Sequence, residues 1–485
     1  MPDMLMLPEI IVVVTAVAVL VADMFLTERS RARLSGPVIA GLAAAAGALL
    51  LGANRPGNML GGQFSVDEVA WWFRLVFVLA GLLTVVLSSD MLSGRVAAPL
   101  RPVGYPGEYY AVLLLSVSGM MYLIAARDLL TLYVSLELAT IPVFALAAWH
   151  RGDSRSGEAG LKYVIIGAMA SAMILYGLGI FYGLTGTMSL DGIGRALRAA
   201  PTSPAMLLAA TLTVAGAGFK LTIVPFHMWA ADVYEGAPTP VTAYLSVASK
   251  AAGLALMFQV LLRMLGGQLA GWELTVALFA AATMTLGNVV AIVQQNIKRF
   301  MAFSAISQAG YLILGFLGPA KEAVPAMLFY FVVYLVTNMA VFACIVWYGN
   351  ETGREQISEY RGLSRTNPLM ALAMMVGLFS LAGIPPLSGF VGKFFLFSIA
   401  SRAGCHWLVA VAGVNSTISL YYYLRIVRQM YIEPVYEGAV RLPVRQPLGL
   451  TVGILSVAVV LLGIIPCLYE TIHAQTIAWL ARLLS

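Results

Sequence analysis

Four ionisable residues lie far from the ends of long apolar stretches. Glu137 stands in TLYVSLELATIPVF, and Lys220, Lys250 and Lys393 stand in three further stretches of the same kind. The chain has only six lysines, so half of them have apolar surroundings. A lysine at the centre of a bilayer costs about 2.5–3.5 kcal/mol on insertion scales, and ionisable groups at that depth commonly form relays. We therefore predict a proton or ion path, with a structural ion pair as the alternative role for each residue.

The composition places these residues in a membrane protein. Of 485 residues, 60% are hydrophobic and 11% are charged, and the mean hydropathy is +0.87. Soluble globular domains average about 25% charged residues, so a soluble enzyme, a disordered protein and a nucleic-acid binder are excluded. The three cysteines are widely separated and form no CxxC pair, which predicts neither a disulfide framework nor a metal site.

Fourteen apolar runs are long enough to cross a bilayer, which takes about 20 residues of helix. Alternation of period two, the mark of a membrane barrel, is absent, so we expect an all-α polytopic membrane protein with about 14 transmembrane helices. A short run at 391–401 is predicted to be the second half of a helix interrupted at Pro385–Pro386. The predicted spans are 5–26, 36–53, 69–89, 109–126, 128–149, 160–184, 205–229, 239–263, 272–293, 300–318, 323–349, 368–389, 405–428 and 448–470.

The distribution of basic residues predicts the orientation of the chain. Arg29, Arg31 and Arg33 follow the first span, so this loop should face the cytoplasm. Alternating from there, the inner loops hold 17 Lys and Arg and the outer loops hold 8, and both termini should lie outside. Arg74 is expected to snorkel to the interface, and Glu9 lies near the start of the first span.

Helix-breaking residues lie beside two of the apolar lysines. Pro225 follows Lys220 by five residues, and Pro385–Pro386 precedes Lys393. Proline removes a backbone donor, and broken backbone at membrane depth is tolerated where it lines a polar cavity. We therefore predict discontinuous helices near Pro225 and Pro385. His227, in PFHMW, is either a relay group or a side chain bonded to freed backbone.

A weak internal repeat relates the two breaks. Gly218-Phe219-Lys220 resembles Gly389-Phe390…Lys393 after a shift of about 172 residues. Two adjacent five-helix blocks have opposite orientations in the membrane, so the repeat would be inverted. The predicted division is an N-terminal three-helix segment at 1–106, five-helix repeats at 107–265 and 270–430, and a C-terminal helix at 431–485.

Longer motifs carry a family resemblance. The tract PFHMWAADVYEGAPTPVTAYLSVASKAAGLA and the later NVVAIVQQNIKRFMAFSAISQAGYLILG resemble the antiporter-like membrane subunits of bacterial NADH–quinone oxidoreductase, respiratory complex I. The end of the chain soon after the last span looks most like the N-type of these subunits. The similarity covers roughly residues 105–430. One departure is Ala231, where the family usually has proline.

The resemblance implies a function and names the same residues. Glu137 looks like the family's span 5 glutamate, and Lys220, Lys250 and Lys393 look like its lysines of spans 7, 8 and 12. It implies a proton-translocating subunit in the bacterial inner membrane, beside other antiporter-like and small membrane subunits of the complex. It also implies no cofactor on this chain, with NADH, flavin, iron–sulfur clusters and quinone on partner subunits.

A mechanism follows if Glu137 faces Lys220. Two unit charges about 4 Å apart attract by about 4 kcal/mol at an effective dielectric constant near 20, so the carboxylate would hold the proton on the lysine. Movement of Glu137 would release the proton toward Lys250 and Lys393, for release outside. Two alternatives stay open, which are an Mrp-type cation/proton antiporter subunit and a non-conducting membrane scaffold. No nucleotide-binding or hydrolase motif is present.

Overall fold

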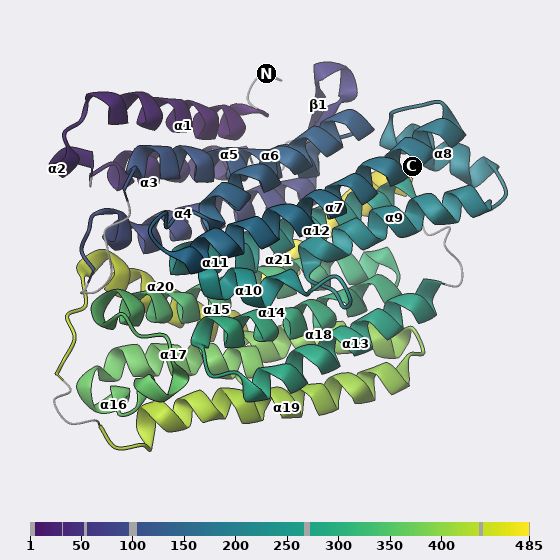
Figure 1. The fold of residues 1–485 in the computed structure, drawn as a ribbon. Coiled ribbons are helices and arrows are strands. Elements are labelled where there is room, and N and C mark those ends of the chain that lie inside the picture. The colour runs from purple at the N-terminus through teal and green to yellow at the C-terminus, as the bar shows by residue number, and fades with distance from the viewer. Residues whose placement is uncertain are drawn as a thin grey trace.

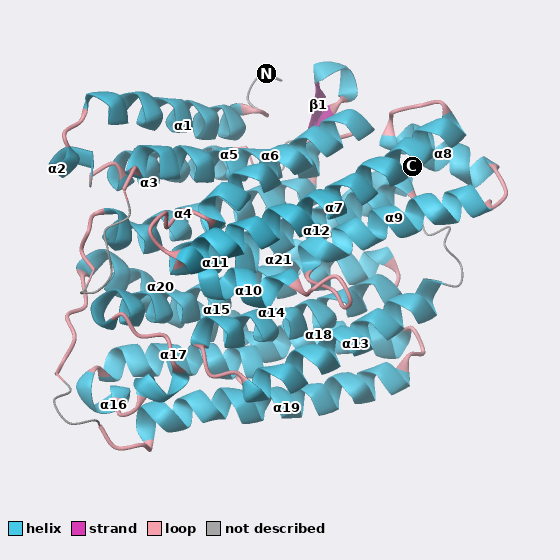
Figure 2. Ribbon diagram, in the orientation of Figure 1, coloured by secondary structure: helices cyan, strands magenta, loops and turns pink. Residues whose placement is uncertain are grey.

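The computed structural model describes residues 5–31, 33–52, 56–96, 104–265, 272–435 and 440–484. Nearly all of them are helical, and the long helices run side by side with roughly parallel axes (Figures 1 and 2). Within these ranges, eleven helical segments are long and apolar enough to cross a membrane. The chain is therefore an all-helical membrane protein, as predicted.

The N-terminal part adds a small hairpin that the sequence did not predict. The strands pair antiparallel, with Asn58 opposite Ser65, and α4 begins directly after them. Asp67 caps α4 by accepting a hydrogen bond from Ala70 N at 2.8 Å. The elements are α1 (Leu7–Phe25), α2 (Glu28–Arg31), α3 (Ser35–Leu51), β1 (Gly57–Met59), η2 (Leu60–Gly62), β2 (Phe64–Val66) and α4 (Glu68–Leu92).

Residues 106–264 form the next group of helices. Asp128, Asp153 and Ser203 each cap the helix that follows, because each side chain accepts a bond from a free N–H of the first turn. The elements are α5 (Pro106–Ala125), α6 (Leu129–Ala147), α7 (Ser154–Thr185), α8 (Leu190–Ala199), α9 (Pro204–Leu221), α10 (Trp229–Gly236), α11 (Thr239–Tyr244), the π-helical turn η3 (Leu245–Ser249), α12 (Lys250–Met257) and η4 (Phe258–Met264).

A second group of helices follows in residues 272–431. Asn296 caps its second helix, as Asp128 caps α6. The elements are α13 (Trp272–Val293), α14 (Ile297–Ile313), η5 (Leu314–Leu317), α15 (Ala320–Thr352), η6 (Ile357–Tyr360), α16 (Leu363–Thr366), α17 (Pro368–Ala382), α18 (Ser388–Arg402) and α19 (His406–Tyr431). The discontinuities predicted near Pro225 and Pro385 are both present, between α9 and α10 and between α17 and α18.

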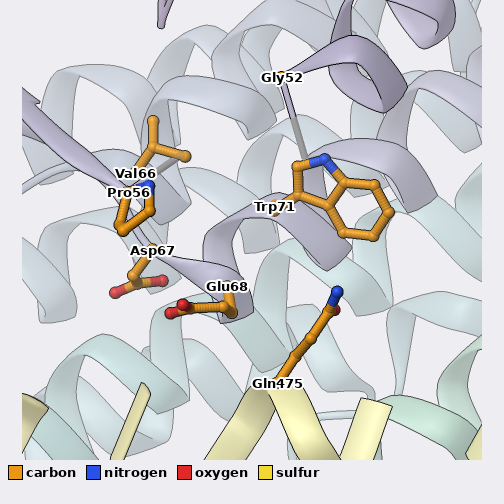
Figure 3. Close-up of a pocket in the computed structure, with 7 residues that line it drawn as sticks. All are labelled: Gly52, Pro56, Val66, Asp67, Glu68, Trp71 and Gln475. Carbon is orange, nitrogen blue, oxygen red and sulfur yellow. The ribbon is translucent and has the colours of Figure 1, made fainter. Parts of the chain in front are cut away.

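The end of the chain differs from its prediction. The run at 448–470 is two helices, α20 (Gln446–Ile464) and α21 (Cys467–Leu484), because Pro466 stands between them and cannot continue the helical hydrogen bonding. Gln475 of α21 accepts a bond from Trp72 at 2.8 Å. Figure 3 shows Gln475 reaching toward Trp71 and Glu68 across a small pocket. The prediction of one final helix was therefore wrong.

Arg74 also differs from its prediction. Its side chain is 2% exposed and donates two bonds to the Glu9 carboxylate, at 2.6 and 2.5 Å. A two-pronged bond between guanidinium and carboxylate is among the strongest in proteins. Because Glu9 offers this partner inside the bundle, Arg74 does not snorkel, and the pair instead joins α1 to α4.

Asp67 organises one end of the helix bundle, which we call the Asp67 end. Its Oδ2 accepts from Arg127 at 2.9 Å, Arg263 at 2.7 Å and Trp479 at 2.9 Å. Burial by itself would raise the pKa of Asp67, but the two guanidinium groups outweigh it and hold the pKa below its ordinary value. Trp479 belongs to α21, and Leu5 near the other terminus accepts a bond from Arg74 through its carbonyl oxygen, so both ends of the described chain lie near this end.

Asp232 marks the opposite end, which we call the Asp232 end. It accepts from Lys162 of α7 and from Arg299 of α14, both at 2.7 Å. These bonds tie the start of α7 and the start of α14 to the short helix α10. The lysines of the apolar stretches lie between the two ends.

Candidate proton path

The first helix break exposes backbone carbonyls to a buried lysine. α9 ends at Leu221 because Thr222 adopts a left-handed conformation, with φ of 61°. The last carbonyls of a helix have no helical partner and carry its negative partial charge. Lys250, which is 2% exposed, donates to Leu221 O at 3.2 Å and also to the Thr222 hydroxyl. A lysine of one helix thus caps the end of another.

Lys220 lies directly before this break and points to a different helix. It is 4% exposed and donates to the hydroxyl of Thr140 on α6. Thr140 lies one turn after Glu137 on the same helix. Gly253 lets α12 approach closely, since a Cβ there would lie 2.9 Å from the Cβ of Lys220. Lys220 and Lys250 are therefore neighbours across the α9–α12 contact.

Glu137 is near Lys220 without a direct ion pair between the two side chains. In the part of the chain that the structure describes, no lysine or arginine nitrogen lies within 4.0 Å of its carboxylate, and its Oε1 is buried without a hydrogen-bond partner. Tyr133, one turn earlier on α6, lies beside the carboxylate. The lysine uses Thr140 as its partner instead.

The second helix break has a related geometry. α17 ends at Ala382, and Gly383 follows with φ of 88°. Lys393 of α18 is 3% exposed and donates to Leu381 O at 2.8 Å and to Ala382 O at 3.1 Å. Its ammonium also lies 4.5 Å from the centre of the Tyr311 ring, a favourable cation–π position.

A polar side-chain ladder on α15 lies between the two breaks. Tyr330, Tyr334 and Asn338 are four residues apart, so they share one face of the helix. Asn338 donates to Ser246 Oγ at 2.5 Å, and Tyr334 donates to Ser246 O at 3.1 Å. Ser246 lies one turn before Lys250, so this end of the ladder meets the first break.

The other end of the ladder meets the second break. Tyr330 donates to Gln308 Oε1 at 2.5 Å, and Gln308 Nε2 donates to Leu381 O at 3.0 Å. The same carbonyl accepts from Lys393. Buried polar groups of α14, α15, α17 and α18 thus connect Lys393 to the face that reaches Ser246.

Further buried polar residues lie around this second site. Ser304 bonds to Tyr423 at 2.6 Å, and Tyr422 donates to Asn288 at 2.8 Å. The hydroxyl oxygen of Ser307 is buried here, and that of Ser249 is buried beside Lys250 at the first break. These groups enlarge the polar region without extending it to the surface.

His227 is not brought to the lysines. It lies in the segment between α9 and α10, where Pro225 and Met228 are exposed. Within the described ranges its Nδ1 is buried and has no hydrogen-bond partner. Its carbonyl accepts from Ala230 N at 2.9 Å, which begins α10. The geometry supports a role in the break itself.

Sequence reasoning missed the partners of the lysines. Thr140, Thr222 and the α15 ladder were not identified, because a hydroxyl in an apolar helix is most often a helix–helix contact. The spacing of four residues between Tyr330, Tyr334 and Asn338 was the one available signal. Within the described residues, no group of three or more His, Cys, Asp or Glu could hold a metal ion.

Comparison with known proteins identifies the family of the chain. A family model described as NADH:quinone oxidoreductase/Mrp antiporter, TM, matches residues 126–419. NADH-quinone oxidoreductase subunit N of Moorella thermoacetica is 41% identical over 460 residues, which cover 94% of each chain. Subunit N of Dehalococcoides mccartyi is 39% identical and covers 95% of this chain and 96% of its own. The chain belongs to the NADH–quinone oxidoreductase subunit N family.

Solved structures agree with this family assignment. A chain of respiratory complex I from Thermus thermophilus with bound aureothin has a TM-score of 0.79 and 34% identity, covering 95% of this chain and 97% of its own. A chain of the Mrp complex from Dietzia sp. has a TM-score of 0.82 at 23% identity, covering 97% of each chain, which shows a shared fold. The resemblance to antiporter-like subunits of complex I is confirmed.

Proposed function

We propose that this chain is a proton-translocating membrane subunit of a bacterial NADH–quinone oxidoreductase. In this proposal, quinone reduction in other subunits drives protons along Glu137, Lys220, Lys250 and Lys393. The observation that carries it is the chain of buried polar groups joining the lysines of the two helix breaks through α15. Hydrophobic side chains would fill this volume at lower cost if the lysines had only to be packed.

Each step moves one proton between named atoms. Lys220 Nζ gives a proton through water to the Thr222 hydroxyl, and Thr222 passes its own hydroxyl proton to Lys250 Nζ, which is neutral when it accepts it. Hydroxyl groups can accept one proton while giving up their own, which suits Thr222, Ser246 and Tyr334 to the intervening steps. Gln308 positions Tyr330 beside the second break, and water carries the proton from the Tyr330 hydroxyl to Lys393 Nζ and between groups one helical turn apart.

Glu137 sets the direction of the first step. A carboxylate near Lys220 favours its charged form, and its withdrawal favours proton release. Thr140 holds Lys220 one turn away from Glu137, so a small change in α6 alters the distance between the two charges. The redox subunits would act through such a change.

Proton transport fits these residues better than sodium transport. Sodium requires several oxygen ligands of negative or partial negative charge. The proposed path instead contains three lysines, Lys220, Lys250 and Lys393, and one carboxylate, Glu137. Repulsion between like charges grows as the dielectric constant falls, so a metal cation would be excluded from these positions.

The architecture and location of the chain complete the proposal. We infer fourteen transmembrane helices by adding α3, α17 with α18, and α19 to the eleven long apolar segments. The two groups of helices would form an inverted repeat, supported by the matching caps Asp128 and Asn296, which are 168 residues apart. At the breaks the corresponding residues Thr222 and Gly383 are 161 apart, so the register differs from the shift of about 172 expected from sequence.

The Asp67 end would face the outside of the bacterial inner membrane, with both termini there, and the Asp232 end would face the cytoplasm. Other membrane subunits of the complex would flank the chain. NADH, flavin, iron–sulfur clusters and quinone would be bound by partner subunits.

Proton pumping by the reconstituted complex tests the proposal. Lys220→Ala and Lys250→Ala should each lower the number of protons moved per electron pair, or lower coupled turnover, with assembly intact. Arg361→Ala is the control, since Arg361 is exposed directly after η6 and lies outside both helix breaks. Normal pumping and normal quinone reduction in both variants would favour the scaffold alternative.

A further inference from the structure

A large cavity opens at the Asp67 end, and its lining does not include Lys220, Lys250 or Lys393. Its volume is about 1360 Å³. Its walls come from α9 and η4 on one side and from α13, η5 and the start of α15 on the other. The cavity therefore lies where the two groups of helices meet.

Cationic side chains surround the mouth of this cavity. Five Lys and Arg and three Asp and Glu line it. Arg127 and Arg263 are already bound to Asp67. Arg195, Arg198 and Lys321 are exposed, and no carboxylate in the described part of the chain lies within 4.0 Å of them. The cavity mouth thus carries an excess of positive charge with free hydrogen-bond donors.

The helix α8 holds two of these arginines in position. Leu190, Ile193 and Leu197 are buried along one face of α8 and pack it onto the bundle. Arg195 and Arg198 lie on the opposite face, where both side chains are exposed. A short amphipathic helix with arginines on its polar face is suited to the surface of a membrane.

Below the mouth, the cavity wall is apolar. Val214 of α9, Leu261 and Leu262 of η4, Val276 of α13 and Phe316 of η5 line it. All five are partly exposed and belong to segments that are apolar and long enough to span a membrane. A free inorganic anion would use the basic mouth and leave these apolar walls in contact with water.

We propose that this cavity binds an anionic phospholipid, with its phosphate on Arg195, Arg198 and Lys321 and its acyl chains along η4 and α13. Basic side chains bind phosphate oxygens by charge-assisted hydrogen bonds, and basic residues at the membrane surface attract anionic headgroups. The acyl chains would cover the apolar wall and fill the junction between the two groups of helices.

Photocrosslinking of the intact complex tests this site. Phosphatidylglycerol with a photoreactive group in its acyl chain is added to the purified complex, and crosslinked peptides of this chain are mapped. Crosslinks should fall on the peptides that hold Leu262 and Val276. Unlabelled phosphatidylglycerol should compete, whereas phosphatidylcholine should compete at least about fivefold more weakly, because its headgroup has no net charge.

A triple variant and a matched control test the role of the mouth. Arg195→Gln with Arg198→Gln and Lys321→Gln should weaken competition by phosphatidylglycerol by about tenfold or more. The control replaces three exposed arginines of the Asp232 end by glutamine and should change nothing. These control residues are Arg155, Arg361 and Arg365.

Other outcomes would overturn the lipid site. Equal competition by phosphatidylcholine would show an unselective apolar groove. Full competition by inorganic phosphate or glycerol phosphate would show a site for a small anion. Crosslinks absent from η4 and α13 in the wild-type complex would show that no acyl chain lies along this wall. The wild-type competition decides the question even if the triple variant does not assemble.

Discussion

At both helix breaks a lysine donates to the free carbonyls of a helix end, but the lysine comes from a different helix in each case. At the first break the carbonyl end of α9 is capped by Lys250 from another helix, and Lys220 stands just before the break. At the second, the carbonyl end of α17 is capped by Lys393 from the second half of the same interrupted helix. The first site therefore brings two cations together, and the second has one.

The difference assigns different tasks to the two sites. Two ammonium groups near one carboxylate respond strongly to small movements, because each charge changes the free energy of protonation of the others. Lys393 is held by two carbonyls and the Tyr311 ring, and no carboxylate of the described residues lies within 4.0 Å of it. The first break is suited to loading a proton and the second to receiving it.

The largest effect is expected from replacing the capping lysines by arginine. Lys250→Arg and Lys393→Arg keep a positive donor for the helix carbonyls but cannot lose a proton. Both should assemble and lower proton pumping by about 10²-fold, the scale of a lost acid–base group. Pumping in proteoliposomes with a pH-sensitive dye measures this. Normal pumping by either variant would reduce that lysine to a structural cap.

A smaller effect is expected from cutting the ladder between the breaks. Tyr334→Phe combined with Asn338→Leu removes both side-chain bonds to Ser246 and should slow coupled turnover by about tenfold, equivalent to about 1.4 kcal/mol. NADH oxidation before and after addition of an uncoupler measures the effect. Tyr348→Phe is the control, since its hydroxyl bonds to Glu359 O at the far end of α15. Equal losses in both would mean that the helix needs its hydroxyls only for packing.

Replacing Thr140 should have a moderate effect on proton pumping, confined to the first break. Thr140→Val leaves Lys220 without its hydroxyl partner and should destabilise the charged lysine by about 1–3 kcal/mol. Pumping should fall severalfold, and Thr140→Ser should restore it. The pH dependence of coupled turnover is the measurement, because a role confined to packing would not shift it. An unchanged pH profile in Thr140→Val would show that Thr140 does not influence the protonation of Lys220.

The smallest effect concerns the left-handed residues at the two breaks. Gly383→Ala puts a side chain where φ is 88° and where its Cβ would lie 3.2 Å from Lys393 Cδ, so it should lower stability by about 1–2 kcal/mol. Thr222→Gly should relieve a similar backbone cost but remove the hydroxyl that Lys250 contacts. Thermal unfolding of the purified complex compares them. Greater destabilisation by Thr222→Gly would mean that the hydroxyl outweighs the backbone.

Much of the fold could be predicted from the sequence because the relevant signals are local. Twenty apolar residues in succession predict a span wherever they occur, and a proline beside a buried lysine predicts an interrupted helix. The prediction of a single span at 448–470 was wrong because Pro466 was counted inside it. In the structure this proline separates two helices. Local signals of this kind locate elements well and their ends less well.

The candidate site could be predicted only in its charged members. Lys220 could be identified because burying a charged side chain in an apolar segment costs free energy. A threonine has no such cost, so the sequence did not point to Thr140. Arg74 was expected at the interface because its partner Glu9 is 65 residues away in the chain. Pairings of this kind depend on how helices pack, which composition and periodicity do not specify.

The capping of each break by two N–H bonds has a consequence for what the lysines can tolerate. An ammonium group has three hydrogens, and the neutral amine keeps two. Lys250 uses two acceptors at α9, and Lys393 uses two at α17. Each lysine can therefore lose a proton and become neutral while keeping both hydrogen bonds to the helix end. The break then changes its charge without changing its backbone structure.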